Sequence, residues 1–199
     1  NARANRRRID SPPSTRDNAR MAQPRPPQRV QYLCGLIGAD APLLARARDA
    51  LADQLGPIDV VSPTYPFDLT DYYAHETGTG LLRQFVTFES LRAPDELPAM
   101  KHATNAIEAE FATDDAVPRP VNLDPGYLTQ AKLVLASMKN FAHRIYLADG
   151  VYAEITLTYV NNRWVPTPWT FPDYAARRYD AFLTTVRDAC RRKLDEETP

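Results

Sequence analysis

The order of strand-like and helical segments is the feature that most constrains the fold of this chain. Apolar strand-like runs lie at residues 30–38, 58–67, 81–91 and 119–128. Helical patterns lie between them, at residues 41–56 after the capping Asp40 and at about 95–112. The order strand, helix, strand, strand, helix, strand is typical of a ferredoxin-like core, so we predict an α+β fold built on βαββαβ.

The remaining third of the chain predicts an additional C-terminal β-hairpin region and a terminal helix. Asp149 and Gly150 form a two-residue hairpin signal between "HRIYLA" and "VYAEITLTYV". A two-residue turn would pair Leu147 with Tyr152 and Ile145 with Glu154, and it would direct Arg144 to the face opposite His143. The last helix is expected at about residues 173–194.

The first 29 residues differ from the rest in composition. They hold 8 of the 24 basic residues and 2 of the 25 acidic residues, so residues 30–199 have a formal net charge of −7. We expect residues 1–29 to form a disordered basic arm, in which Met21 is a plausible start, and residues 30–199 to form a single globular domain. A domain this acidic is not expected to bind nucleic acid generally.

Localisation is predicted from two further features of the chain. No apolar run approaches the roughly 20 residues that span a bilayer, and no apolar segment of a signal peptide follows the basic N-terminus. Cys34 and Cys190 lie far apart and are expected to be buried thiols rather than a disulfide. We therefore expect a cytoplasmic protein.

The loop "PFDLTDYYAHETG", residues 66–78, concentrates acidic side chains between two strands. Asp68, Asp71 and Glu76 could bind a divalent cation such as Mg²⁺ through oxygen ligands. The alternative is a solvated loop in which Asp68 and Asp71 cap turns.

One flank of the second helix carries a polar row. Lys101, Asn105 and Glu108 follow at i, i+4 and i+7 beside the apolar stripe. Either these side chains face a cleft next to the core, or they form a network at its boundary.

The stretch "NLDPGYL", residues 122–128, interrupts an apolar run with polar and turn-forming residues. Pro125 and Gly126 predict a turn, which would end the strand on Asn122 and Asp124. Polar side chains at such a strand end could bind a ligand or could form an Asx turn.

The hairpin offers a pair of groups suited to proton transfer. His143 and Glu154 are expected on one face of it, where they could act as an acid/base pair or form a structural hydrogen bond. The chain contains no phosphate-loop motif, no Cys-x-x-Cys pair and no His-Glu-x-x-His motif, and its three histidines make a zinc site of the usual ligands unexpected.

Several longer segments, including "FDLTDYY", "KHATNAIEAEF", "VNLDPGYLTQAKLVLAS", "HRIYLADGVYAEITL" and "WTFPDY", resemble a bacterial family known as domain of unknown function 4416. The resemblance covers nearly all of residues 30–185 and implies no established activity. Members sometimes carry the label GTP-binding protein, which the missing phosphate loop does not support.

These observations lead to two hypotheses. The first is a cytosolic enzyme or ligand-binding protein that acts on a phosphorylated small molecule or nucleotide, with Mg²⁺ possible and with Asp124, His143 and Glu154 as catalytic candidates. The alternative is a non-catalytic interaction or structural module with a buried polar network. The ligand-binding candidates are Asp71, Arg83, Lys101, Asn105, Glu108, Asn122, Tyr127, Lys132 and Arg144, with Lys139 as a further cation. Convergence of these side chains on one pocket favours the first hypothesis.

Overall fold

A computed structural model describes residues 23–69, 80–112 and 118–197. Within these residues nine strands form one sheet in the order β2-β4-β1-β5-β6-β8-β7, while β3 pairs with β4 and β9 pairs with β8. The strands are β1 (Gln31–Gly38), β2 (Ile58–Val61), β3 (Tyr65–Pro66), β4 (Leu82–Phe88), β5 (Val121–Leu128), β6 (Lys132–Ser137), β7 (Ile145–Ala148), β8 (Val151–Val160) and β9 (Arg163–Pro166).

The predicted α+β class is confirmed. Neighbouring strands of the sheet pair antiparallel. The helices are α1 (Ala41–Leu55), α3 (Leu97–Phe111), α4 (Pro172–Ala175) and α5 (Asp180–Glu197), with a 3₁₀ turn, η2 (Pro94–Glu96), before α3. The sheet is wider than the four strands of the predicted core because β6, β8 and β7 extend it beyond β5.

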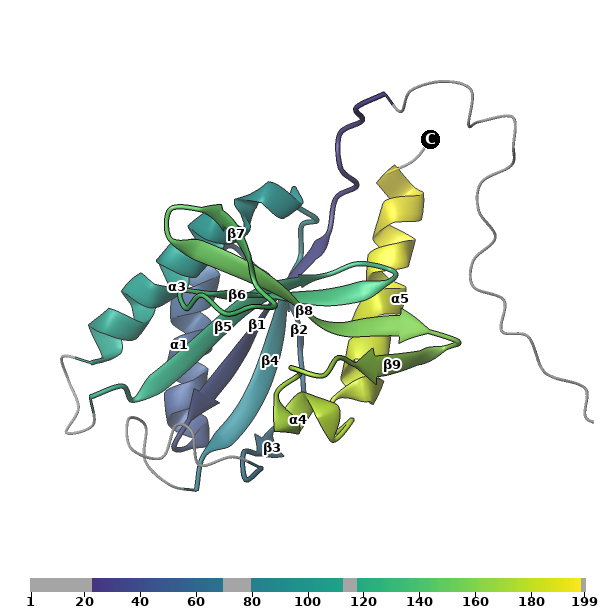
Figure 1. Ribbon diagram of the computed structural model, residues 1–199. Coiled ribbons are helices and arrows are strands. Elements are labelled where there is room, and N and C mark those ends of the chain that lie inside the picture. Colours follow the sequence, from purple (N-terminus) through teal and green to yellow (C-terminus); the bar gives the residue numbers. More distant parts are fainter. Residues whose placement is uncertain (1–22, 70–79, 113–117, 198–199) are drawn as a thin grey trace, which may run out of the picture.

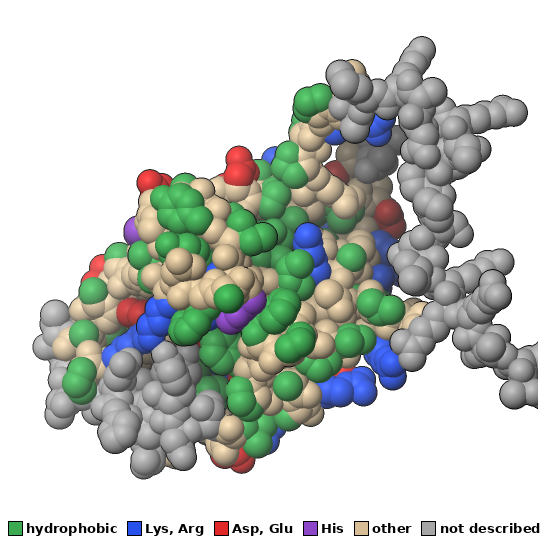
Figure 2. Space-filling view, in the orientation of Figure 1, with side chains coloured by type: hydrophobic (Ala, Val, Ile, Leu, Met, Phe, Trp, Pro, Cys, Tyr) green, Lys and Arg blue, Asp and Glu red, His purple; other side chains and the backbone are tan. Residues whose placement is uncertain are grey.

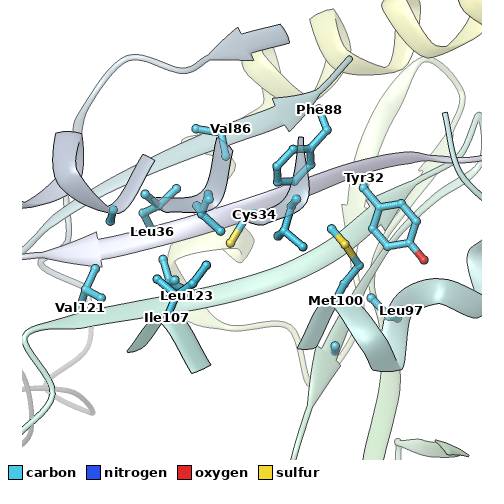
Figure 3. Close-up of a cluster of buried hydrophobic side chains, with 14 of the residues drawn as sticks. Tyr32, Cys34, Leu36, Val86, Phe88, Leu97, Met100, Ile107, Val121 and Leu123 are labelled. Atoms are coloured by element: carbon cyan, nitrogen blue, oxygen red, sulfur yellow. The ribbon is translucent and has the colours of Figure 1, made fainter. Parts of the chain in front are cut away.

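Helices cover both faces of the sheet, and β1 is buried between them (Figure 1). On one face α1 and α3 pack against β1, where Tyr32, Cys34 and Leu36 meet Met100 and other apolar side chains of the first core (Figure 3). On the other face Leu33 and Phe85 meet Phe182 and Leu183 of α5. The central strand therefore contributes alternate residues to two cores, as the two-residue period of a strand requires.

The prediction of a turn at Pro125 and Gly126 is wrong. Strand β5 continues through both residues, with Pro125 opposite Cys34 and Gly126 opposite Leu33 of β1. Gly126 is required by a close approach of β6 rather than by a turn, because a Cβ at this position would lie 2.3 Å from the carbonyl oxygen of Val134.

The two-residue turn at Asp149 and Gly150 is present, with φ values of 51° and 77° and with Ala148 opposite Val151. The predicted pairing beyond it is wrong, because the register shifts between Tyr146 and Ala148 and places Ile145 opposite Ala153. Leu147 forms an irregularity in the strand, and this local feature is invisible to a rule that counts residues from the turn.

The predictions for the N-terminal arm fall largely outside the described residues. Residues 23–29 carry no helix or strand and are exposed. A helix long and apolar enough to cross a membrane is not found in the described part of the chain.

Candidate functional site

The sheet opens between β5 and its neighbour β6. These strands pair only over Gly126–Leu128, opposite Leu133–Leu135, so residues 121–125 of β5 have no strand partner on that side. We call the gap between residues 121–125 and the strands β6 and β8 the fork. A cavity of about 400 Å³ occupies it, a size within the range of small-molecule sites.

Side chains from α3 replace the missing strand along the edge of β5. The Lys101 ammonium donates to the carbonyl oxygen of Leu123 at 3.0 Å, and the Leu123 N–H donates to the Glu108 carboxylate. Two residues further along the same edge is Pro125, which has no N–H to satisfy. This arrangement explains why a proline is tolerated in the interior of β5.

The cavity collects most of the polar residues selected from the sequence. Its lining includes both amides, Asn105 and Asn122, and a carboxylate, Asp124, from α3 and β5. The remaining lining residues among the candidates are Arg83, Lys101, Lys139, His143, Arg144 and Glu154.

Arg83 of β4 lines the cavity and is held there by charged and aromatic neighbours, although its Nε is buried without a hydrogen-bond partner in the described residues. Its guanidinium donates to the Tyr174 hydroxyl at 2.7 Å and lies 3.4 Å from the Asp173 carboxylate and 3.7 Å from that of Asp124. It also lies over the rings of Phe67, Phe85, Tyr174 and Tyr179. Burial alone would lower the pKa of Arg83, but Tyr174, Asp173 and Asp124 raise it, so the guanidinium stays charged.

Glycine at position 35 makes room for this guanidinium. A Cβ on Gly35 would lie 2.6 Å from Nη2 of Arg83 and 3.1 Å from the Phe85 ring. Strand β1 therefore passes beneath Arg83 without a side chain, and the arginine can lie flat against the sheet.

Glu154 of β8 is the centre of a second network. Its Oε2 accepts from Nε of Arg144 at 2.7 Å and lies 3.2 Å from Nε2 of His143, while its Oε1 is buried without a hydrogen-bond partner in the described residues. Arg144 also donates to the Ser137 hydroxyl and to the Lys139 carbonyl. Arg144 and His143 thus share the Glu154 carboxylate, so the prediction that Arg144 faces away from His143 is wrong.

The α3 side of the fork has hydrogen-bonding capacity left over. Lys101 is 5% exposed, and of its three ammonium donors one is used within the described residues, on Leu123. Asn122 donates to Asp124 at 2.8 Å and has no described partner for its oxygen, while Asn105 makes no hydrogen bond with the described residues. A ligand in the cavity can therefore meet open donors and acceptors on this side.

The sequence of the chain matches a known protein family. The family model for Domain of unknown function (DUF4416) matches residues 28–189. The chain belongs to this family. None of the curated proteins matches the chain significantly.

Three of the described ligand-binding candidates of the DUF4416 chain lie outside the cavity lining. Glu108 accepts a bidentate pair of hydrogen bonds from Arg119, from Nε to Oε2 and from Nη2 to Oε1, in addition to the Leu123 N–H. Tyr127 packs edge-on against Tyr32, with 5.9 Å between the ring centroids, on the face covered by α1 and α3. Lys132 begins β6 opposite Thr158, beyond the paired end of the fork.

The predicted metal site finds no support in the described residues of this DUF4416 chain. Asp68 pairs with Arg178 at 2.7 Å, while Asp71 and Glu76 lie outside the described residues. Within residues 23–69, 80–112 and 118–197, no three His, Cys, Asp or Glu side chains lie close enough together to hold a metal ion.

Some residues of the DUF4416 cavity were missed from the sequence. Gly35 had a usable signal, because an isolated glycine inside an apolar strand often marks a close approach. Asp173 and Tyr174 follow a proline in a short aromatic segment and gave no signal of their own. Arg119 and Trp169 likewise become lining residues only through the fold.

Proposed function

We propose that the fork binds a phosphorylated small molecule, with nucleotides included in that class, and that the protein acts as an enzyme or a binding protein for it. One observation carries the proposal. Lys101 is a buried ammonium with two open donors at the wall of a cavity. Holding an ammonium out of water is costly unless it is paired, so an anionic ligand would complete the site.

The charges around Lys101 support an anionic ligand. Each carboxylate in the lining already has an arginine: Asp124 and Asp173 face Arg83, and Glu154 faces Arg144. Lys101 interacts electrostatically with the Glu108 carboxylate, which is also bound by Arg119. Fixed cations of this kind stabilise phosphoryl oxygens.

His143 and Glu154 are the candidates for proton transfer. The contact from Glu154 to Nε2 fixes the orientation of the imidazole, in the way that a carboxylate orients a catalytic histidine. Nδ1 is then the nitrogen that can exchange a proton with a ligand. Asp124, whose side chain is 22% exposed, is the carboxylate best placed to bind a Mg²⁺ ion carried in by a phosphate.

The alternative, a non-catalytic module with a buried polar network, is favoured by the Arg83 and Glu154 networks. In both networks oppositely charged side chains pair with one another, although Nε of Arg83 and Oε1 of Glu154 have no hydrogen-bond partner in the described residues. These networks account for Arg83 and Arg144 but leave the open groups of Lys101, Asn105 and Asn122 without a role, and for this reason we favour ligand binding.

The proposal extends to the fold and the cellular location. The order β2-β4-β1-β5, with α1 and α3 on one face, supports a ferredoxin-like core widened by β6, β8 and β7. We place the protein in the cytoplasm, with a small molecule rather than nucleic acid as its partner.

A thermal-shift screen tests the function. Wild type would be heated with inorganic phosphate, sugar phosphates and nucleotides, each with and without Mg²⁺, because a ligand at 100 times its dissociation constant adds about 2.7 kcal/mol of stability. Lys132→Met is the matched control, since Lys132 lies outside the cavity. We expect a phosphorylated compound to raise Tm for wild type and for Lys132→Met but not for Lys101→Met. Equal shifts in all three proteins, or no shift with any compound, would overturn the proposal.

A further inference from the structure

Three aromatic rings form a near-parallel stack in the cavity wall. The His143 ring lies 5.2 Å from Trp169 with 10° between the ring planes, and 5.9 Å from Phe141 with 11° between them. All three residues line the cavity. The histidine is therefore enclosed by rings, while Phe141 and Trp169 form the ends of the stack.

The two end rings are more exposed than large apolar side chains usually are. Phe141 is 55% exposed and Trp169 is 40% exposed. Hydrophobic side chains gather in a band between the β7–β8 hairpin and α4, on the face shown in Figure 2. An exposed apolar surface next to a polar cavity is typical of a ligand-binding site.

Of the two end rings, Trp169 is the better platform for a ligand. The guanidinium of Arg144 already lies 5.0 Å above the Phe141 ring, whereas Trp169 has His143 as its one ring or cation neighbour in the described residues. The Trp169 indole is also held in place, because its Nε1–H donates to the carbonyl oxygen of Ile155 at 3.0 Å. A fixed ring loses little conformational freedom when a ligand stacks on it.

We infer that the phosphorylated ligand carries a planar heteroaromatic ring, which stacks on Trp169 while the phosphate lies at Lys101. This inference rests on the proposed function and narrows its ligand class to nucleotide-like molecules. Asn105 and the free oxygen of Asn122 lie in the same cavity and can bind the hydroxyl or ring polar groups of such a ligand. The volume of about 400 Å³ accommodates a molecule with both parts.

The test compares ligands that share a phosphate and differ in the ring. Affinities of the four common ribonucleoside monophosphates, ribose 5-phosphate and inorganic phosphate would be measured by titration calorimetry on wild type and Trp169→Leu. Stacking of a base on an aromatic side chain commonly contributes an affinity gain of about tenfold or more. We expect at least one nucleotide to bind wild type about tenfold more tightly than ribose 5-phosphate does. We expect Trp169→Leu to remove this difference in affinity without lowering the affinity for ribose 5-phosphate.

Tryptophan fluorescence of the wild-type protein gives a second readout that needs no variant. The chain has two tryptophans, and Trp164 is buried, with its Nε1–H bonded to Thr184. Nucleotides should therefore quench Trp169 emission over a constant background, and ribose 5-phosphate should not.

The outcomes separate the two proposals. Two results would overturn the inference that a ligand ring stacks on Trp169: ribose 5-phosphate binds as tightly as every nucleotide, or nucleotides bind without quenching. Both results would leave the proposal of phosphate binding at Lys101 intact. Failure of every phosphorylated compound to bind, or binding unaffected by Lys101→Met, would overturn both proposals.

Discussion

Two cations of nearly equal burial, Arg83 of β4 and Lys101 of α3, line the same cavity but have different surroundings. Arg83 is 3% exposed and Lys101 is 5% exposed. Arg83 has two carboxylates, a tyrosine hydroxyl and four aromatic rings around it. Lys101 has one carbonyl oxygen as its hydrogen-bond partner in the described residues.

The comparison indicates that burial does not identify the ligand-binding residue. A buried cation that is paired with carboxylates stabilises the fold, and its removal leaves those carboxylates unpaired. A buried cation beside a cavity that has unused donors and no carboxylate at ion-pair distance in the described residues, as Lys101 has, can bind an anion. We therefore assign a structural role to Arg83 and a ligand-binding role to Lys101, although both line the same cavity.

Loss of Arg83 should have the largest effect on folding. Arg83→Met leaves the buried Asp173 carboxylate without its cation, and breaking a buried pair in this way costs about 3–5 kcal/mol. The free energy of unfolding in urea is the measurement. Arg177→Met is the control, because Arg177 is exposed and its pair with the partly exposed Asp180 should contribute less than about 1 kcal/mol. Equal effects of the two substitutions would show that the Arg83 network contributes little to folding.

Gly35→Ala should weaken the same network by a different route. The added Cβ collides with Nη2 of Arg83, and such overpacking typically costs about 1–3 kcal/mol. A double-mutant cycle with Arg83→Met tests this cause, because Gly35→Ala should lower the free energy of unfolding by less in the Arg83→Met protein than in wild type. Strict additivity would mean that Gly35 is needed for a reason other than Arg83.

Asp124→Asn should change ligand binding more than folding. The asparagine keeps the shape of the side chain but loses its charge, and Asp124 is the partly exposed partner of Arg83, which retains Asp173. Unfolding should change by less than about 1 kcal/mol, while affinity or turnover with the ligand identified in the screen should fall by at least tenfold. A mutant that binds as wild type does would return Asp124 to a structural role.

The smallest effect is expected in the pH dependence of stability. Burial raises the pKa of Glu108 above its usual value, opposed in part by Lys101 and Arg119. Because the folded pKa lies above the unfolded one, the contribution of this group is fully present below the unfolded pKa and is lost as the pH rises through the folded pKa.

Glu108→Gln cannot titrate and serves as the comparison. The stability of wild type relative to Glu108→Gln should decline from about pH 4 upward. Parallel curves of unfolding free energy against pH for the two proteins would contradict the raised pKa.

The sequence predicts which polar residues line the site better than it predicts how the strands around them are arranged. Helical periodicity predicts the shared face of Lys101 and Asn105, and strand periodicity predicts that of Asn122 and Asp124, since both periods depend on local geometry. The fork was not predictable, because it depends on where β6 leaves β5. The sequence predicts a turn at the proline and glycine of β5 for the same reason. The open strand edge that tolerates the proline and the close neighbour that requires the glycine lie in other segments.

The hairpin illustrates the same limit. The Asp149–Gly150 turn is encoded by two adjacent residues and was predicted, whereas the irregularity at Leu147 was not. His143 and Glu154 nevertheless meet, because the segment before β7 brings His143 to Glu154 together with Arg144. The Asp173 and Tyr174 partners of Arg83 come from a segment about 90 residues away in the chain, and no local pattern relates them.

The most direct test of the account measures two quantities on Lys101→Met: the dissociation constant of the phosphorylated ligand and the free energy of unfolding. Removal of the ammonium abolishes one hydrogen bond, to Leu123, and also removes a desolvated charge, so unfolding should change by less than about 1.5 kcal/mol. Affinity should fall by tenfold or more, because a charge-assisted contact to the phosphate is lost. Unchanged affinity together with a loss of about 3 kcal/mol or more in stability would contradict the account, since Lys101 would then have the structural role assigned to Arg83.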